Sequence, residues 1–366
     1  MIRVELISEA DAADVRAFNA RLRAAGVEFQ SPARLTELTT PVSSGPALWA
    51  QVWVARDDET VRGGFILKHE RLFLADGVLD VGNFQLPLSE GIVDRRYAMV
   101  AFELVRTALR ENARLYSLGM GGMHRPLPRV LARLGWTVES VPFFFRVIRG
   151  GTFARNIRAL RTSKLRRFLL DAAAFTGLAS VSAACWRVAA RVTGSAPRRS
   201  VNLTPVPDFD ARVDAVFEAC QPLFGAMLER GSEALNLKFP RSDARLLRFL
   251  VEKDGRCIGW LIVTVTQLHG HRQFGSMHLG AIVDGLMPPE FTGAAIASVT
   301  EVMTRMGVDT IVSNQSHSAW RSALRDNLFL PGSSNFVLAR SPGFATGISL
   351  SDLHVNRGDG DGPINL

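Results

Sequence analysis

The sequence predicts an α/β (α+β) protein in which two mixed β-sheets, each layered with helices, follow one another along the chain. Three observations support this prediction. Short apolar strands alternate with amphipathic helices in both halves of the sequence. The second half repeats the order of elements of the first. The chain has 366 residues, of which 47% are hydrophobic, and this is enough to build two cores.

The first half divides into elements that can be justified one by one. Ser8 is placed to cap a first helix and Gly26 to end it, and the Asp76-Gly77 pair is typical of a hairpin turn. We expect strands within 2–7, 52–67, 71–86, 115–122 and 137–148, and helices within 8–26, 95–112 and 126–136. A single helix between runs of strands, followed by strand, helix and strand, is typical of a mixed sheet rather than an all-α or all-β unit.

The composition excludes several classes of protein. Cys185, Cys220 and Cys257 are widely spaced and form no C-x-x-C pair, so neither a disulfide framework nor a zinc site is encoded. The histidines follow no metal-binding spacing, and we expect no metal. The amino-terminal residues lack a basic stretch followed by an apolar one, and no long run is uniformly apolar. We therefore expect a cytoplasmic protein.

The positive charge of the chain is concentrated in one segment. Residues 149–200 contain eleven basic residues and one acid, a net charge of +10 in a chain whose total is +8. The segment is rich in alanine and aromatic residues, and we expect a basic amphipathic helical linker. It could be a plain connector, or it could lie on an anionic membrane through residues 153–191. Nucleic acid is the weakest alternative, because no known RNA-binding module accompanies the charge.

The two halves can be aligned with each other at several points. The alignment places Gly63 over Gly259 and the segment 91–94 over 281–284. It also places residues 118–136 over 311–329, with matched histidine, leucine and aromatic positions. The matched pairs in that stretch are His124 with His317, Leu131 with Leu324, and Trp136 with Phe329. We therefore expect an internal duplication.

The order of elements and the L-x-x-L-G-W or L-x-x-x-L-F ending of each half resemble the GNAT acyltransferase superfamily. The resemblance implies a tandem pair of domains at 1–148 and 201–345, joined by the linker 149–200 and followed by a flexible tail 346–366. It implies transfer of an acyl group from acetyl-CoA or another acyl-CoA to an amine. Many members of the family carry a tyrosine where this chain has Leu131 and Leu324, so another group would have to protonate the leaving thiolate.

The resemblance also implies a binding site for the coenzyme A pyrophosphate at the start of one helix in each half. The family motif Q/R-x-x-G-x-G/A corresponds to "EFTGAA" in the second half, where Glu290 stands in place of the usual cation or amide. The residues implied in coenzyme binding are Ile282, Val283, Phe291, Thr292, Gly293, Ala294 and Ala295. The first half has "YAMVAF" at this place, without a glycine. The second half is therefore the expected catalytic half.

The segment "SNQSH" follows a strand of the second half that looks buried, and it is the strongest candidate for the acceptor side of the site. The resemblance implies that the acyl thioester lies between the splayed fourth and fifth strands, next to this segment. We expect His317 to take the proton from the amine, Asn314 and Gln315 to orient the acceptor, and Asp284 to hold the ammonium or act as the base. The alternative is that the segment only caps the following helix.

The first half offers Glu90 and His124 as a second candidate site. The acceptor remains open, and an amino sugar or a lipid-linked glycan precursor is one class that a membrane-apposed linker would favour. Two other functions also remain open. One is aminoacyl transfer of the FemA/FemB kind, and the other is a catalytically decayed scaffold at the membrane surface. The acyl chain length and the oligomeric state are not encoded in any motif.

Overall fold

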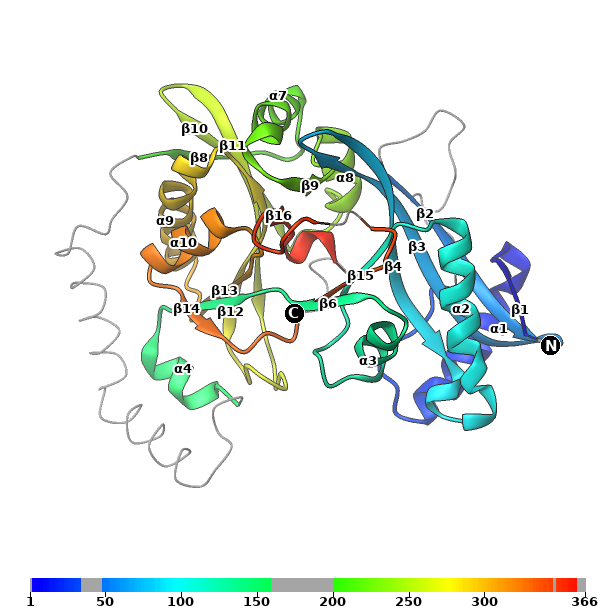
Figure 1. Ribbon diagram of the computed structural model, residues 1–366. Helices are drawn as coiled ribbons and strands as arrows, with labels where there is room; N and C mark the ends of the chain where they lie inside the picture. Colours follow the sequence, from blue (N-terminus) through cyan, green and yellow to red (C-terminus); the bar gives the residue numbers. More distant parts are fainter. Residues whose placement is uncertain (1, 34–47, 159–199, 345–346, 361–366) are drawn as a thin grey trace.

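A computed structural model describes residues 2–33, 48–158, 200–344 and 347–360, and it contains two mixed β-sheets with helices packed on them (Figure 1). The α/β fold class is therefore confirmed. Most of the expected linker, residues 159–199, lies outside the described residues, as do residues 361–366 at the end of the expected tail. In the part that the structure describes, no helix is long and apolar enough to cross a membrane.

The first sheet is built mainly from the first half of the chain. Its strands are β1 (Ile2–Leu6), β2 (Leu48–Asp57), β3 (Thr60–Leu74), β4 (Gly77–Ser89), β5 (Leu115–Gly119) and β6 (Thr137–Ser140). Helix α1 (Ala12–Ala24) covers one face, and α2 (Ala98–Glu111) and α3 (Pro126–Arg133) cover the other. Two short helices, η3 (Glu90–Ile92) and η4 (Arg95–Tyr97), connect β4 to α2. The hairpin predicted around Asp76-Gly77 is found between β3 and β4, with Ala75 and Asp76 in the turn and Gly77 as the first residue of β4.

The second sheet repeats this layout with the second half of the chain. Its strands are β8 (Asn202–Pro205), β10 (Leu246–Lys253), β11 (Arg256–Gln267), β12 (His278–Leu286), β13 (Thr310–Asn314) and β14 (Leu330–Gly332). The helices of this half are α7 (Ala211–Cys220), α8 (Ser232–Lys238), α9 (Pro289–Arg305) and α10 (Ser318–Asp326). Strand β13 is buried along its whole length and β12 is buried after His278, as is typical of parallel strands covered on both faces.

Each half gives its last strand to the sheet of the other half. Strand β7 (Phe143–Val147) comes from the first half but pairs with β13 and β14 in the second sheet. Strand β15 (Val337–Arg340) comes from the second half and pairs between β5 and β6 in the first sheet. We expected one strand over 137–148; it is instead two strands in two sheets, separated at Val141–Pro142. The expected boundary at residue 148 therefore separates the two halves of the sequence, but it does not separate the two sheets, because each sheet contains a strand from the other half.

The structure gives physical support to the internal duplication. Gly63 and Gly259 occupy matching places, because a Cβ on either would lie within 2.8 Å of a carbonyl oxygen on the neighbouring strand, that of Leu88 or of Leu286. The endings of α3 and α10 also match. The backbone N–H of Trp136 donates to the Leu131 carbonyl at 3.1 Å, and the N–H of Phe329 donates to the Leu324 carbonyl at 3.0 Å.

In the internal alignment of the two halves, the match of residues 91–94 with 281–284 is wrong. Residues 281–284 lie inside β12, whereas residues 91–94 lie beyond the end of β4. The pairing of the antiparallel strands shows the reason, because His69 faces Gly82 in the first sheet and Val265 faces Gly280 in the second, and His69 and Val265 have the same spacing in sequence as Gly63 and Gly259. Gly82 is therefore equivalent to Gly280, and the likeness of "GIVD" to "AIVD" comes from apolar composition alone.

The end of the chain is not a flexible tail over the residues that the structure describes. Residues 353–360 are buried, and they include the short strand β16 (Leu353–His354) and the helical turn η6 (Arg357–Asp359). Strand β16 pairs with β9 (Ala226–Leu228), and β9 also pairs with β3, so the segment extends the first sheet. Its polar composition predicted disorder, whereas buried ion pairs and hydrogen bonds hold it in place. We call residues 353–360 the C-terminal segment.

The described beginning of the expected linker is a short helix, α4 (Gly150–Asn156). Phe153 on this helix stacks on Phe145 of β7 at 6.0 Å between ring centroids, while Arg155 and Arg158 are exposed. This part of the linker therefore packs on the second sheet with its arginines in solvent, as expected for a connector.

Candidate active site

The parallel strands β12 and β13 separate where the resemblance places the acyl thioester. Their pairing ends at Ile282 and Ser313, and β12 changes register against β11 just after that point. Beyond it, Val283, Asp284 and Gly285 continue on one side, and Asn314 continues on the other. The bulge and the end of the pairing leave a gap between the two strands at their carboxyl ends.

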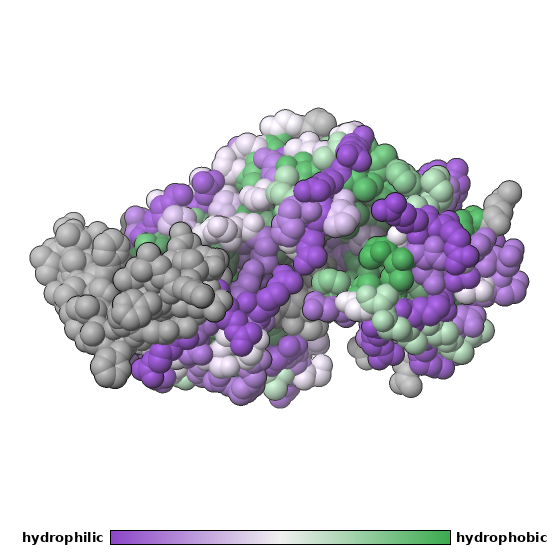
Figure 2. Space-filling model, turned by 90° about the horizontal axis from the view of Figure 1, so that it is seen from below, coloured by the Kyte–Doolittle hydropathy of each residue, from purple (hydrophilic) through white to green (hydrophobic). Residues whose placement is uncertain are grey.

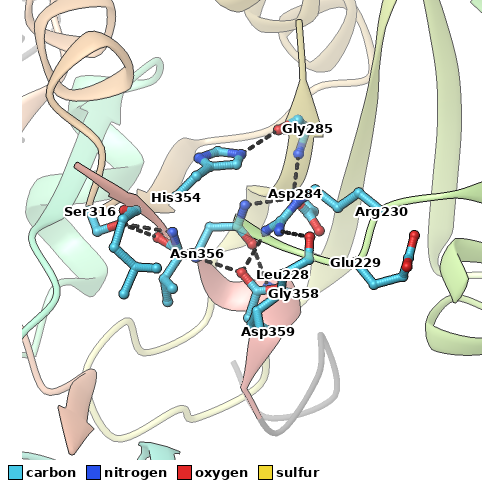
Figure 3. A network of polar contacts seen from close by, with 12 residues as sticks. Leu228, Glu229, Arg230, Asp284, Gly285, Ser316, His354, Asn356, Gly358 and Asp359 are labelled. Atoms are coloured by element: carbon cyan, nitrogen blue, oxygen red, sulfur yellow. Dashed lines mark hydrogen bonds and ion pairs between the residues drawn. The ribbon is translucent and has the colours of Figure 1, made fainter. Parts of the chain in front are cut away.

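The C-terminal segment fills this gap and is hydrogen-bonded to both sides of it (Figure 3). On the β12 side, His354 Nε2 lies 2.9 Å from the Gly285 carbonyl oxygen, and Asn356 Nδ2 donates to Asp284 Oδ1 at 2.5 Å. On the β13 side, the N–H of Ser316 donates to the Val355 carbonyl at 3.0 Å. A further bridge joins the backbones of Gln315 and Asn356. In the second half, the place expected for the thioester is therefore occupied by the chain itself.

A buried arginine holds the segment at this position. Arg230, which follows β9, is fully buried and forms ion pairs with Asp284 at 3.3 Å and with Asp359 at 2.6 Å (Figure 3). Burial raises the pKa of Asp284 although Arg230 opposes the effect. Burial acts in the same direction on Asp359, but there Arg230 and Lys238 outweigh it and lower the pKa. The two carboxyl groups share one cation, and their titrations are coupled.

The same network continues into the first half. Lys238 of α8 lies 2.9 Å from Glu70 on β3, and Lys68 lies 3.3 Å from the same glutamate. The Tyr116 hydroxyl of β5 donates to Glu70 and to the Asp359 carbonyl. Asn83 on β4 also donates to the Asp359 carbonyl, at 2.9 Å. The segment thus lies between the halves and joins the ends of both pairs of splayed strands.

The structure brings the four predicted catalytic residues close to this segment but gives them structural partners. Arg357 donates to Asn314 Oδ1 at 2.9 Å, and the Gln315 amide donates to Ser313 at 3.3 Å. Asn314 Nδ2 and Gln315 Oε1 have no hydrogen-bond partner among the described residues. Asp284 is fully buried, as described above.

His317 caps helix α10 through its side chain. Its Nδ1 accepts a hydrogen bond from the N–H of Ala319 at 3.3 Å, so only Nε2 remains for other chemistry. The ring lies 4.5 Å from Phe224 and 6.2 Å from His354, measured between centroids. Burial lowers the pKa of His317, and the carboxylate of Asp352 only partly opposes this. The contacts of His317 therefore agree with the alternative in which the segment caps the following helix.

The predicted coenzyme cradle in the second half lies at the start of α9. Two prolines, Pro288 and Pro289, precede Glu290 there, so two of the backbone positions carry no N–H. Glu290 is exposed and adds a negative charge. Thr292, Ala294 and Ala295 are buried, and the Gly293 carbonyl accepts a hydrogen bond from Asn327. Ile282 and Val283 are buried in β12. This helix start presents few donors to an anion.

The second candidate site of the first half is not brought together. Glu90 is held by Arg21 at 2.9 Å and by Arg62 at 3.0 Å. Burial acts to raise the pKa of Glu90, but the hydrogen bonds from both arginines overcome this and lower it. His124 is exposed in the turn before α3 and lies beside Gly122.

The first half has its own pair of separating strands. The pairing of β4 with β5 ends at Asn83 and Tyr116, and β4 is bulged at Leu86, whose φ is +48°. Helix α2, which follows, is preceded by Arg95 and Arg96, and both are exposed. The C-terminal segment contacts this part of β4, because the Gly360 carbonyl accepts a hydrogen bond from Gln85.

Sequence reasoning missed the residues that build the buried network, namely Lys68, Glu70, Arg230, Lys238, His354 and Asp359. They come from three stretches that are distant in sequence, 68–70, 230–238 and 354–359, and no spacing connects them. The one available signal was the pair of charges Arg357 and Asp359 in a short, otherwise glycine-rich stretch. Arg95 and Arg96 were visible at the start of a predicted helix.

Comparison with known proteins gives a consistent answer at the level of the fold. No protein-family model matches the sequence, and no curated protein matches it. Among solved structures, a GCN5-related N-acetyltransferase from Anabaena variabilis is similar, with a TM-score of 0.53 and 11% identity over 93% of this chain and 73% of that chain.

Two further structures cover the same 93% of this chain. One is N-myristoyltransferase from Saccharomyces cerevisiae with bound myristoyl-CoA, with a TM-score of 0.53, 10% identity and 82% of that chain covered. The other is a conserved protein from Enterococcus faecalis described as a probable N-acyltransferase, with a TM-score of 0.52, 9% identity and 73% of that chain covered. At these identities the likeness concerns the fold. The chain therefore has the fold of the GNAT superfamily, present twice in tandem.

Proposed function

We propose that the protein is an acyl-CoA-dependent N-acyltransferase and that its first half, rather than its second, binds the thioester. The observation that carries this choice is the start of helix α2, which is preceded by exposed Arg95 and Arg96, whereas the start of α9 has two prolines and Glu290. The fold supports the reaction class, because the similar structures include an N-acetyltransferase and an N-myristoyltransferase with bound myristoyl-CoA. The proposal moves the working site away from the half that the sequence favours.

The two helix starts differ in what they offer a pyrophosphate. Helix α2 is preceded by two exposed arginines, and Arg95 has no ion pair among the described residues. Arg96 forms an ion pair with Asp94 at the surface and, among the described residues, with no other acid. An anion at a helix start gains from free N–H groups and from the helix dipole, and neighbouring arginines add to this. Helix α9 begins instead with two prolines and Glu290.

The acyl group would then lie between β4 and β5, beyond the bulge at Leu86. Gly119 at the end of β5 and residues 120–122 after it all have positive φ values, and three of these four residues are glycines, so the turn lets a ligand approach the backbone. An amine nitrogen would attack the thioester carbonyl carbon. The C–N bond forms as the C–S bond breaks, the nitrogen loses a proton, and the leaving thiolate accepts one.

The acceptor would enter on the face of the first sheet opposite α2, where the second half packs. Lys68, Glu70 and Asn83 on that face are buried and paired within the network described above, so the acceptor would bind beside them and not on them. We propose an amino sugar or a lipid-linked glycan precursor as the acceptor class. His124 is placed in the turn after β5, and we propose it as the first group to test for proton transfer.

Calorimetric titration with acetyl-CoA and with a longer acyl-CoA tests the proposal. The unchanged protein should bind at least one of them, and ligand at about 100 times its Kd should stabilise the fold by about 2.7 kcal/mol. Arg95→Glu combined with Arg96→Glu should abolish binding, because two cations become anions at the helix start.

The matched control places bulk in the cradle of the second half. Gly293→Arg should leave the affinity for acyl-CoA unchanged. If Gly293→Arg abolishes binding and the double arginine variant binds normally, the second half is the binding half and the proposal for the first half fails. If no acyl-CoA binds to the unchanged protein, the acyltransferase proposal fails and aminoacyl transfer and the scaffold function remain; the filled second gap is the specific support for the scaffold.

A further inference from the structure

Helices α2 and α3 cover one face of the first sheet, and their outer sides carry exposed apolar residues. Of the large apolar side chains that are exposed in the described part of the chain, half lie between residues 92 and 134. They are Ile92, Val93, Met99, Phe102, Met123 and Leu134. Single exposed apolar residues are normal, whereas a gathering of them marks an interaction site. We call the exposed side of residues 92–134 the outer face.

The outer face is also basic. Residues 92–134 contain eight arginines but only three acids, and each acid is already paired with an arginine of the same segment. These pairs are Asp94 with Arg96 at 2.6 Å, Glu103 with Arg106 at 2.7 Å and Glu111 with Arg110 at 3.8 Å. The other five arginines are exposed and have no ion pair among the described residues: Arg95, Arg114, Arg125, Arg129 and Arg133. The face therefore has an uncompensated positive charge.

Helix α3 shows how the two properties combine. Its inner side buries Pro128 and Leu131 against the first core. Arg125, Arg129 and Arg133 are spaced four residues apart and follow one side of the helix. Exposed Met123 and Leu134 lie at its two ends. Figure 2 shows apolar residues in green among hydrophilic residues in purple over the first half, at the right of the view.

We propose that the outer face docks the protein on an anionic membrane surface. Arginine guanidinium groups pair with lipid phosphates, and protruding phenylalanine, methionine and leucine side chains enter the interface between headgroups and acyl chains. A nucleic acid would use the arginines but would leave the methionine and leucine side chains without a partner. A second copy of this chain would bring the same positive charge against itself. The inference does not depend on whether the first half binds acyl-CoA.

Co-sedimentation with lipid vesicles, in the absence of any acyl-CoA, tests the proposal. The full chain should sediment with vesicles of phosphatidylcholine and phosphatidylglycerol, and less so with pure phosphatidylcholine or at high salt. Arg133→Glu combined with Leu134→Ser should lower the partition coefficient by more than about 30-fold. Each arginine contributes about fivefold near an anionic surface, so replacing one by a glutamate accounts for about 30-fold, and the loss of the Leu134 side chain adds to this.

The chain offers a matched control at the end of another helix. Arg305 and Met306 end α9 as Arg133 and Leu134 end α3, and both are exposed. Arg305→Glu combined with Met306→Ser makes the same change in charge and apolar surface, and it should bind vesicles like the unchanged protein. The melting temperature of each variant shows that it folds.

Three outcomes would overturn the proposal. One is binding of the Arg133→Glu, Leu134→Ser variant equal to that of the unchanged protein, which would assign any membrane binding to the basic segment 149–200. Another is an equal loss in the control variant. The third is a dimer in sedimentation velocity that dissociates only in the α3 variant, which would make the outer face an interface between copies.

Discussion

Replacement of Arg230 by methionine tests whether the buried network holds the two halves together. Arg230 is fully buried and is shared by Asp284 and Asp359. Methionine keeps most of the volume but removes the charge. Asp359 would keep Lys238 at 3.5 Å, whereas Asp284 would lose its cation and would keep only its hydrogen bonds.

The expected cost follows from the burial of the carboxylates. Removing one partner of a buried ion pair costs about 3–5 kcal/mol, because the other charge stays buried without compensation. For a chain of 366 residues that unfolds as one unit, the entropy of unfolding is about 0.8 kcal/mol per kelvin, so the melting temperature should fall by about 4–6 °C. Asp284 can relieve part of the cost by taking up a proton, since burial already raises its pKa.

The pH dependence gives the sharper measurement. A carboxyl group whose pKa is raised in the folded state binds more protons there than in the unfolded chain, so its protonation stabilises the fold as the pH falls. The loss of stability in Arg230→Met should therefore be larger at pH 8 than at pH 5 in thermal or urea unfolding. Adding Asp284→Asn should recover part of the stability at pH 8 and remove most of the difference between the two pH values.

Arg248→Met is the matched control. Arg248 is also buried, but within the described part of the chain it donates to the backbone carbonyls of Leu246, Phe239 and Pro240 and to no carboxylate. Its loss should destabilise the protein by a similar amount at both pH values. Equal losses at pH 5 and pH 8 for Arg230→Met would refute the argument that charge compensation holds the segment.

Three other predictions concern the core, the acid stability and the site. Gly63→Ala should cost more than 2 kcal/mol of unfolding free energy, because its Cβ would lie 2.6 Å from a side-chain carbon and 2.8 Å from a carbonyl oxygen, whereas Gly77→Ala, with nothing within 4 Å, should be neutral by urea unfolding. Burial lowers the pKa of His69 to about 4, so the unfolded chain binds the proton first and stability should fall between pH 6.5 and 4; His69→Phe should flatten that fall. In a working N-acyltransferase, His124→Ala should lower kcat/KM by about 10²-fold or more and His317→Ala should change it little; the reverse ranking would return the chemistry to the second half.

The local elements of the fold could be predicted because their signals are local. The helix expected over 95–112 is found as α2, and the hairpin expected around Asp76-Gly77 is found with Ala75 and Asp76 as its turn residues. The exchange of β7 and β15 could not be read in the same way, since a strand sequence does not say which sheet it joins. Pro142 was the one visible sign that 137–148 is not a single strand, because proline cannot donate a ladder hydrogen bond.

The site was harder to predict for a different reason. "SNQSH" was correctly singled out as polar and close to a buried strand end, but its partners come from the other end of the chain. Composition alone made 353–360 resemble disorder, because its few apolar residues cannot form a core. Arg230 and Lys238 supply the missing stabilisation across long sequence separations, and no periodicity reports such pairs.

The exchange of strands sets a waiting time during synthesis. Strand β6 ends at Ser140 but reaches its sheet only through β15, which begins at Val337. At about 5–20 residues per second, a ribosome needs roughly 10–40 s to make the intervening chain. During that time β5 presents an unpaired edge, and β7 has no partner at all. We therefore expect the nascent first half either to need a chaperone or to pass through an intermediate that aggregates slowly. We also expect that the two halves do not fold when they are expressed as separate polypeptides cut at residue 148.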